Sequence, residues 1–354
     1  MTMHVVVAGW LLGPPSGANR RLLALLEHTA ARLRADERIT VLHGVAFTPP
    51  PLPNVAWRAI AIPPAPTLRR AFAEWRRLRA PLRELGATVY DHGFLPLPRV
   101  PVPTCLVVHD LRAVDGFTHW PRAIARRVLR AACERAAVVT APSEWTAARL
   151  RTLAPRATIH VVPNGVTLPA STSVPTPPPF AAPAAGYVLH VGHLEPRKNV
   201  GVVVDALRLL PAAARPELWL AGRDAGALQG LRARAGDVGI RVLGVVTEPE
   251  LAALYHHARA VVVPSAHEGF GLPALEGLAH GRPVLVAAAG ALPEVVGLAG
   301  VCVPAPDATA WSTAIAATAA AGEAAPRRAR AASFTWPSAA ERQLAAWRHA
   351  AASS

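Results

Sequence analysis

The chain alternates two kinds of segment along its 354 residues. Short runs rich in β-branched residues, such as 5–8 and 104–109, are followed by longer Ala, Leu and Arg segments with helical spacing. A parallel strand needs a crossover connection to the next strand, and that connection is usually a helix. The alternation therefore predicts an α/β protein whose parallel sheets are covered by helices.

A proline-rich stretch interrupts this alternation once. The run Pro163-Asn164-Gly165-Val166 ends the first series, six prolines follow before residue 184, and a second series starts at Tyr187. Such a composition is typical of a linker, so we expect two doubly wound, Rossmann-like domains. The predicted boundaries are 1–165 for the first domain, 166–185 for the linker and 186–335 for the second domain. Because ligands of such sheets bind beyond the carboxyl ends of the strands, we expect the site in a cleft between the domains.

The familiar nucleotide and metal fingerprints are missing. Gly9, Gly13 and Gly17 have the wrong spacing for a dinucleotide turn, and no P-loop sequence occurs. The chain contains no Asp-x-Asp pair, so the sequence does not favour a site in which a metal ion holds a nucleoside diphosphate. His190 and His193 would flank a strand end, which is a poor chelate, so we expect no metal site.

Cysteine usage and hydropathy indicate a cytoplasmic protein. Cys105, Cys133 and Cys302 have no CxxC spacing, which fits a reducing compartment. The first twelve residues lack a basic start, so we expect no signal peptide. No run of about 18 uninterrupted apolar residues is present, so we expect no transmembrane helix.

Positive charge is concentrated in the first half of the chain. Residues 1–165 contain 22 Arg and 10 acidic residues, a net charge of +12, whereas residues 166–354 have a net charge of +2. Arginines cluster in the helical segments 68–85 and 121–135, the first of which also contains Leu68, Phe72 and Trp75. A helix on an anionic membrane surface and a merely solvated helix face both fit this pattern. Nucleic acid is the least supported partner, because no zinc finger, basic zipper or aromatic RNP-type strand occurs.

Lys198 is the only lysine among 36 arginines. It lies in Glu195-Pro196-Arg197-Lys198-Asn199, between the end of a predicted strand and the start of the next predicted helix. An ammonium is a compact point charge rather than a planar fork, and such a charge at a strand-to-helix junction suits a phosphate ligand.

The segment 264–277 carries the strongest motif. It places Gly269 and Gly271 in a loop between a predicted strand and a helix, and glycines let backbone amides approach a ligand closely. Glu268 lies in the loop and Glu276 is expected in the first helical turn, so both carboxylates can accept hydrogen bonds from sugar or ribose hydroxyls. The alternative is a capped helix with a solvated glutamate.

These motifs resemble those of the retaining GT-B glycosyltransferases of family 4, most of all the bacterial mannosyl- and glucosyltransferases. The resemblance covers nearly the whole chain and includes Pro142-Ser143, Pro163-Asn164-Gly165-Val166 and Phe334-Thr335-Trp336. It implies a GT-B architecture, in which a C-terminal helix, here 336–354, packs back on the first domain.

The resemblance also implies roles for the donor-side residues. Arg197 and Lys198 would bind the donor diphosphate and neutralise the leaving group, whose charge grows in the transition state. Glu276 would hold the ribose, and Glu268 would hold the donor sugar. The remaining donor contacts would come from backbone groups of Gly244, Val245, Gly269, Phe270, Gly271 and Leu272.

Two first-domain residues complete the expected site. His109 follows a strand and matches the family's His-Asp segment. A histidine at a strand end can donate a hydrogen bond to a sugar hydroxyl or work with a base, whereas a lone histidine more often has a structural role. Gly17 matches the family's glycine loop, although the chain has Ser16-Gly17 where two glycines are common. His193 stands where many members have arginine, and Arg197 is expected to take that role.

We therefore expect a metal-independent, retaining hexosyltransferase that needs no cofactor and uses a GDP- or UDP-sugar as donor. The acceptor is not identified, and the basic first domain fits a lipid-linked or otherwise anionic one. Two alternatives stay open, a nucleotide-sugar epimerase of the same architecture and a non-catalytic nucleotide-sugar-binding protein.

Overall fold

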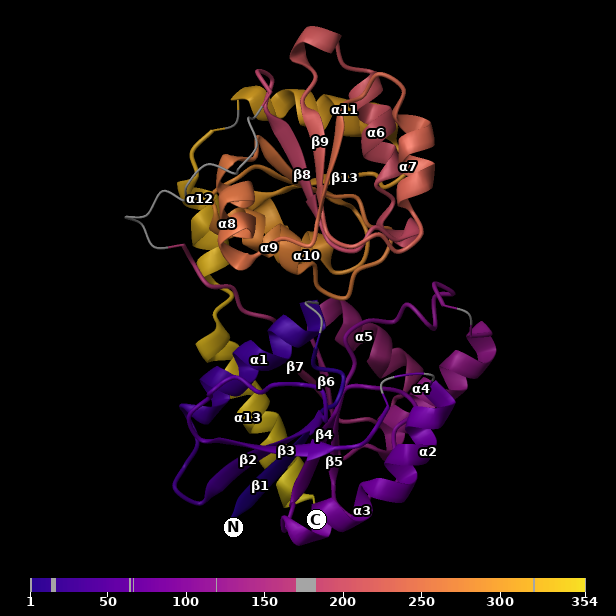
Figure 1. The fold of residues 1–354 in the computed structure, drawn as a ribbon, viewed down its shortest axis with the longest axis vertical. Coiled ribbons are helices and arrows are strands. Elements are labelled where there is room, and N and C mark those ends of the chain that lie inside the picture. The colour runs from indigo at the N-terminus through magenta and orange to yellow at the C-terminus, as the bar shows by residue number, and fades with distance from the viewer. Residues whose placement is uncertain are drawn as a thin grey trace. The chain divides into compact units, whose positions relative to one another are not determined.

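The computed structural model describes residues 2–13, 17–63, 65, 67–118, 120–169, 183–320 and 322–353. The chain folds into two units, one formed by Met1–Gly165 with Trp336–Ser354 and the other by Val166–Thr335 (Figure 1). Most of the predicted linker, residues 170–182, lies outside the described residues.

Unit 1 is built on a seven-stranded sheet with the order β3-β2-β1-β4-β5-β6-β7. All its strand pairs are parallel, and central Val5 lies between Ile39 and Val89. The strands are β1 (Met3–Gly9), β2 (Glu37–Gly44), β3 (Val55–Ile60), β4 (Val89–His92), β5 (Thr104–Val107), β6 (Val138–Ala141) and β7 (Ile159–Val161). The alternation of the sequence thus produces the parallel sheet that it predicts.

Helices cover both faces of this sheet. The helices are α1 (Gly17–Ala30), α2 (Thr67–Arg77), α3 (Arg79–Glu84), α4 (Arg122–Arg135), α5 (Glu144–Leu153) and α13 (Trp336–Ala352). Crossovers between parallel strands are right-handed, so the change of direction at β1 puts α1 on one face and α2 to α5 on the other. Figure 1 shows this arrangement, with α13 beside α1.

Unit 2 repeats the design with a six-stranded parallel sheet of order β10-β9-β8-β11-β12-β13. Its strands are β8 (Tyr187–Val191), β9 (Glu217–Ala221), β10 (Ile240–Gly244), β11 (Ala260–Val263), β12 (Val284–Ala287) and β13 (Val301–Val303). Its helices are η1 (Pro196–Lys198), α6 (Gly201–Arg208), η2 (Ala212–Ala214), α7 (Leu228–Ala235), α8 (Glu248–His257), α9 (Leu272–Ala279), α10 (Leu292–Val296), η3 (Gly297–Ala299), α11 (Ala308–Ala317), η4 (Thr318–Ala320) and α12 (Ala325–Ala332). Strands buried on both faces, such as β11, form its core.

Two local features differ from what the sequence suggested. The arginine-rich segment 68–85 is two helices rather than one, because Pro81 lacks the amide that would bond to the carbonyl of Arg77, and its ring clashes with that carbonyl. The strand β4 was not predicted, since its sequence ends in Asp91 and His92, which are unusual in a central strand. No helix within the described residues combines the length and the apolar character that crossing a membrane requires.

A buried carboxylate ties the last helix to the sheet of unit 1. Asp91, at the end of β4, accepts hydrogen bonds from Trp347 Nε1 (2.5 Å) and Gln343 Nε2 (3.1 Å) of α13. Nearby, Arg348 forms two hydrogen bonds with the buried Glu37 at 2.7 and 2.9 Å. Such buried acceptors are costly unless they are paired, so these contacts fix where α13 lies on the sheet.

Burial raises the pKa of Asp91 from its ordinary 3.8 to about 6, against the opposing effects of Trp347 and Arg21. Because this folded-state pKa exceeds that of the unfolded chain, the folded protein should lose stability as the pH rises from about 4 to about 6. Asp91→Asn lacks this titration and keeps an acceptor for Trp347. The free energy of unfolding of Asp91→Asn minus that of the native chain should therefore be about 2–3 kcal/mol larger at pH 7 than at pH 4, since one pKa unit corresponds to about 1.4 kcal/mol.

Urea unfolding of both proteins across this pH range measures the difference, in which the effects of other groups cancel. The matched control is Asp36→Asn, which removes an exposed carboxylate of the same unit. A difference for Asp91→Asn that does not change with pH would contradict the prediction.

Candidate functional site

Three loops that carry candidate residues leave the same edge of the unit 2 sheet. Lys198 follows β8, Gly244 ends β10 and Glu268 follows β11. These strands belong to one parallel sheet, so their carboxyl ends lie along one edge. That edge is where ligands of open α/β sheets bind.

The short turn η1 presents both predicted phosphate-binding cations. Asn199 follows it with a left-handed backbone (φ 51°), and the side-chain Nδ2 of Asn199 donates to the carbonyl of Ala305 (3.0 Å). Asn adopts this conformation more readily than most residues, so it can end the turn. Arg197 and Lys198 are therefore held at the strand end before α6 begins.

Lys198 and Glu268 form an ion pair with 2.5 Å between Nζ and Oε1, and their side chains are only 12% and 13% exposed. Arg197 lies in the same cluster. Its Nε donates to Glu195 Oε2 (2.7 Å), and its Nη1 donates to the carbonyl of His267 (3.2 Å). The structure thus brings Arg197, Lys198 and Glu268 into one cluster.

The charges of this cluster balance one another. Burial opposes ionisation of Glu268, but the charges of Lys198 and then Arg197 outweigh burial and hold the pKa of Glu268 below its ordinary value. His190 at the end of β8 is buried, and burial together with the Lys198 charge lowers its pKa to about 4. At neutral pH Glu268 is therefore an ionised carboxylate, and the His190 imidazole is neutral.

Glycines allow the loop before α9 to pass close to other backbone. A Cβ at Gly290 would lie 2.4 Å from the carbonyl oxygen of Glu268, and the amide of Ala291 donates to that oxygen (3.0 Å). Gly271, at the start of α9, has φ +99°, which L-residues rarely adopt. These positions fix the backbone that carries Glu268.

Glu276 lies deeper in α9 than the sequence analysis expected. The helix begins at Leu272, so Glu276 is in its second turn and not in its first. The side chain is buried, and its Oε2 accepts a hydrogen bond (2.6 Å) from the hydroxyl of Tyr255 on α8. The ring of Tyr255 also stacks on His280. The alternative of a solvated glutamate is therefore wrong for Glu276.

The other donor-side candidates differ in what they offer a ligand. Gly244 has φ +70° and its carbonyl accepts from Gly222 (2.7 Å), while Val245 beside it is 60% exposed. Phe270 is buried and packs edge-on against Phe334 at 5.7 Å, so its side chain belongs to the core. Gly269 and Leu272 lie on either side of the Phe270-Gly271 pair.

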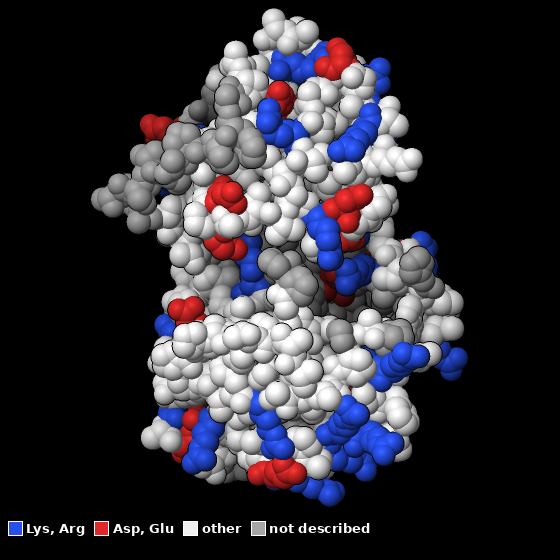
Figure 2. Space-filling model, in the orientation of Figure 1, with Lys and Arg blue, Asp and Glu red and all other residues white. Residues whose placement is uncertain are grey.

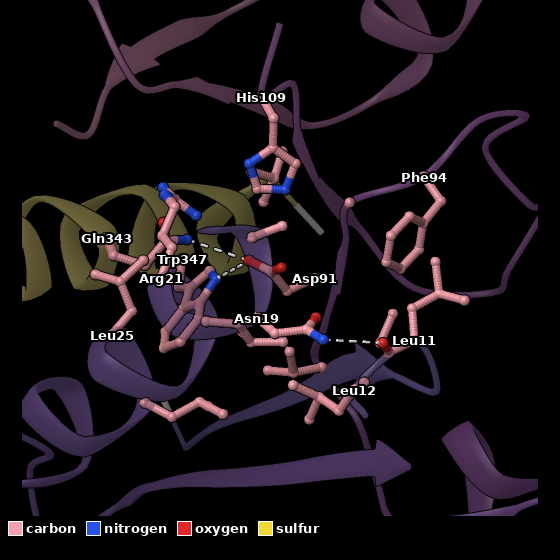
Figure 3. Close-up of a pocket in the computed structure, with 18 residues that line it drawn as sticks. Leu11, Leu12, Asn19, Arg21, Leu25, Asp91, Phe94, His109, Gln343 and Trp347 are labelled. Carbon is pink, nitrogen blue, oxygen red and sulfur yellow. Dashed lines mark hydrogen bonds between the residues drawn. The ribbon is translucent and has the colours of Figure 1, made fainter. Parts of the chain in front are cut away.

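In unit 1, a cavity of about 60 Å³ opens at the carboxyl ends of β1, β4 and β5 (Figure 3). His109 follows β5 and points into the cavity together with Arg21 and Asp91. Gly17 begins α1, and the next two residues line the cavity. Ser16, before Gly17, lies outside the described residues.

This cavity holds charged groups in an apolar surrounding. Burial, and then the charges of Arg21 and Arg112, lowers the pKa of His109 to about 3, so the imidazole is neutral at neutral pH. Arg21 is buried, and its Nε donates to Asn164 Oδ1 (2.6 Å). A neutral imidazole can donate or accept one hydrogen bond to a sugar hydroxyl without bringing a second positive charge.

Several of these residues were missed from the sequence. Arg21 and Asp91 stand in no motif, and only the burial of the segments that carry them would have signalled a role. Tyr255 lies one residue before a His-His pair on a helix and gave no signal that it would bind Glu276. Among the described residues, no group of three His, Cys, Asp or Glu is placed to share a metal ion.

Comparison with known proteins gives matches to two family models. The model described as "Glycosyltransferase Family 4" matches residues 15–168, and the model described as "Glycosyl transferases group 1" matches residues 185–320. A curated relative, O-antigen chain mannosyltransferase B from Escherichia coli, is 43% identical over 121 residues, which are 32% of each chain. Matches to four further curated relatives span 40% to 60% of those proteins' own lengths.

Solved structures match the whole chain at low identity. Sucrose-phosphate synthase from Thermosynechococcus elongatus superposes with a TM-score of 0.78 and 21% identity, covering 99% of this chain and 100% of the other. Anabaena HepE, solved in complex with UDP and glucose, superposes with a TM-score of 0.69 and 17% identity, covering 97% and 98%. At such identities the likeness shows the fold, which is that of the GT-B glycosyltransferases. Together with the two consecutive family models, these findings place the chain in family 4 of the GT-B glycosyltransferases.

Proposed function

We propose that the chain is a retaining glycosyltransferase that moves a hexose from a nucleoside-diphosphate sugar to an acceptor hydroxyl. The transfer would need neither a metal ion nor a cofactor. The hexose would be of the mannose or glucose type, in the synthesis of a glycan, glycolipid or other glycoconjugate. Family membership and the mannosyltransferase relative support this proposal.

The observation that carries the proposal is the nearly buried cluster of Arg197, Lys198 and Glu268. When the bond between sugar and diphosphate breaks, negative charge grows on the leaving phosphate, and fixed cations stabilise that charge. In the described structure each of the two cations has a carboxylate partner, Glu195 or Glu268. An arriving diphosphate would take the place of these partners, and Glu268 would then be free to accept a hydrogen bond from a sugar hydroxyl.

The donor side has further support in the positions of Glu276 and Gly244. Tyr255 donates a hydrogen bond to Oε2 of Glu276, and a carboxylate is the kind of acceptor that the hydroxyls of a ribose require. Gly244 ends β10 at the same sheet edge, Val245 follows it, and both would meet the base. HepE was solved with UDP, so a UDP-sugar is one candidate donor, and a GDP-sugar is the other.

We further propose that the acceptor is lipid-linked or otherwise anionic, and that transfer takes place in the cytoplasm at the inner face of the membrane. The net charge of +12 in residues 1–165 supports this proposal, because it attracts anionic acceptors and surfaces. No nucleic acid is expected to take part.

A donor screen tests the proposal as a whole. UDP, GDP, ADP and TDP are compared by thermal shift, since a ligand that binds only the native state raises the melting temperature. We expect one base to stabilise the chain equally with EDTA and with a divalent ion. The matching labelled sugar nucleotide should then transfer its sugar to an acceptor in a membrane lipid extract with retained configuration, as measured by NMR of the product.

The alternatives give different outcomes in this screen. An epimerase would convert the sugar nucleotide without any acceptor, and a non-catalytic binding protein would show the shift but no turnover. Strict dependence on a divalent ion would contradict metal independence, and an inverted product would contradict retention.

Lys198→Ala should lower kcat by about a hundredfold or more, because one charge that stabilises the leaving group is lost. The variant leaves Glu268 without its partner, so the double variant Lys198→Met/Glu268→Gln is measured beside it to separate lost charge from lost folding. Arg232→Ala, which removes an exposed cation of the same unit, is the matched control and should be as active as the native chain. Near-native turnover in Lys198→Ala would rule out the diphosphate role.

Glu276→Gln should weaken binding of the nucleoside diphosphate by about tenfold, the effect of losing one charge-assisted hydrogen bond. Isothermal titration with the diphosphate selected by the screen measures this change. Tyr255→Phe removes the hydroxyl that binds Glu276 but keeps the carboxylate, so it should change affinity only a few-fold. Equal losses in both variants would assign Glu276 a structural role instead.

A further inference from the structure

Helix α2 exposes a stripe of three large apolar side chains. Leu68 is 81% exposed, Phe72 59% and Trp75 58%. Their spacing of four and three residues places them on one face of the helix, and the rings of Phe72 and Trp75 lie 5.8 Å apart. We call these three residues the α2 stripe. Single exposed apolar residues are common, but a contiguous stripe marks an interaction surface.

The opposite face of α2 is polar and buried. Arg70 and Glu74 are 7% and 1% exposed and form an ion pair with 3.2 Å between Arg70 Nε and Glu74 Oε1. Arg70 also donates to the carbonyl of Leu95 (2.5 Å) and lies over the ring of Phe94. An amphipathic helix normally turns its apolar face to the core. In α2 the charged pair faces the core instead, so the outward position of the stripe is fixed by the fold.

Arginines surround the stripe. The sheet face that carries α2 also carries α3 and α4, because all three belong to crossovers that run in the same direction. Figure 2 shows blue side chains gathered over this part of unit 1. The exposed arginines of these helices are Arg69, Arg76, Arg77, Arg79, Arg83, Arg122, Arg126, Arg127 and Arg130. The α4 helix adds Ile124, which is 51% exposed.

We infer that this face docks on an anionic lipid bilayer. The α2 stripe would enter the interfacial region, and the flanking arginines would bind lipid phosphates. Stable attachment to a membrane surface takes two signals, and this face supplies both an apolar and a basic one. A second copy of the chain fits less well, because a two-fold contact would bring both sets of arginines together.

This inference deepens the proposed function and rests on it in one respect. Docking would bring the transferase to an acceptor anchored in the same membrane. Binding to vesicles is measured without turnover, so docking and transfer can fail separately. In particular, Lys198→Ala should bind vesicles as the native chain does.

Sedimentation of the full chain with lipid vesicles tests the inference. The native chain should sediment with vesicles of phosphatidylcholine and phosphatidylglycerol, should not sediment with phosphatidylcholine alone, and should be released by salt. Phe72→Ser/Trp75→Ser and Arg69→Glu/Arg76→Glu should each lower the partition coefficient by about tenfold or more, through loss of the apolar or the basic signal.

Matched controls lie on unit 2. Leu209→Ser/Leu298→Ser removes two exposed apolar residues, and Arg208→Glu/Arg232→Glu makes the same change in net charge as the α2 variant. Both controls should bind like the native chain. Equal losses in the controls, or equal binding to neutral vesicles, would overturn the inference. A dimer in vesicle-free sedimentation that Phe72→Ser/Trp75→Ser dissociates would assign the stripe to a second copy and overturn it as well.

Discussion

Parallel pairing of the strands is the constraint on which the position of each candidate residue depends. All strands of one sheet end at the same edge, so the loops that follow them meet there even when many residues separate them in the chain. In unit 2 this brings Lys198 within 2.5 Å of Glu268, which is seventy residues later. In unit 1 it gathers Asp91 and His109 around one cavity (Figure 3). The candidate residues of each unit therefore follow from its topology before any side-chain contact is considered.

The charge balance of the unit 2 cluster suggests how such a site stays stable without its ligand. Two nearly buried cations without partners would cost several kcal/mol each, and the carboxylates of Glu195 and Glu268 offset part of that cost. In the proposed transfer, a diphosphate would replace these partners with comparable negative charge and would leave neither cation unpaired. The exchange would also limit ground-state affinity, because binding would have to break existing ion pairs. Stabilisation would then be greatest where the phosphate charge is greatest, in the transition state.

The candidate residues of unit 2 could be named from the sequence because their signals are local, and their roles in binding a donor stay predictions. The lone lysine and the segment 264–277 each lie within a few residues of a strand end, where composition reveals the turn. The depth of Glu276 was wrong because α9 begins at Leu272, and a start that differs by one or two residues moves a side chain to the next turn. Asp91 was missed because its partners Gln343 and Trp347 lie about 250 residues away, and no local pattern reports such a contact.

Unit 1 also departs from the rule that relates helix pattern to burial. In α2 the residues that pattern alone would bury are exposed, and the pair that it would expose is buried. Burial raises the pKa of Glu74 to about 7 although Arg70 lies beside it, so the ion pair does not fully offset the loss of hydration. Turning the helix over would bury three large apolar side chains and hydrate both charges. The outward α2 stripe is therefore a departure from the local pattern rule, and such departures are expected at sites of interaction.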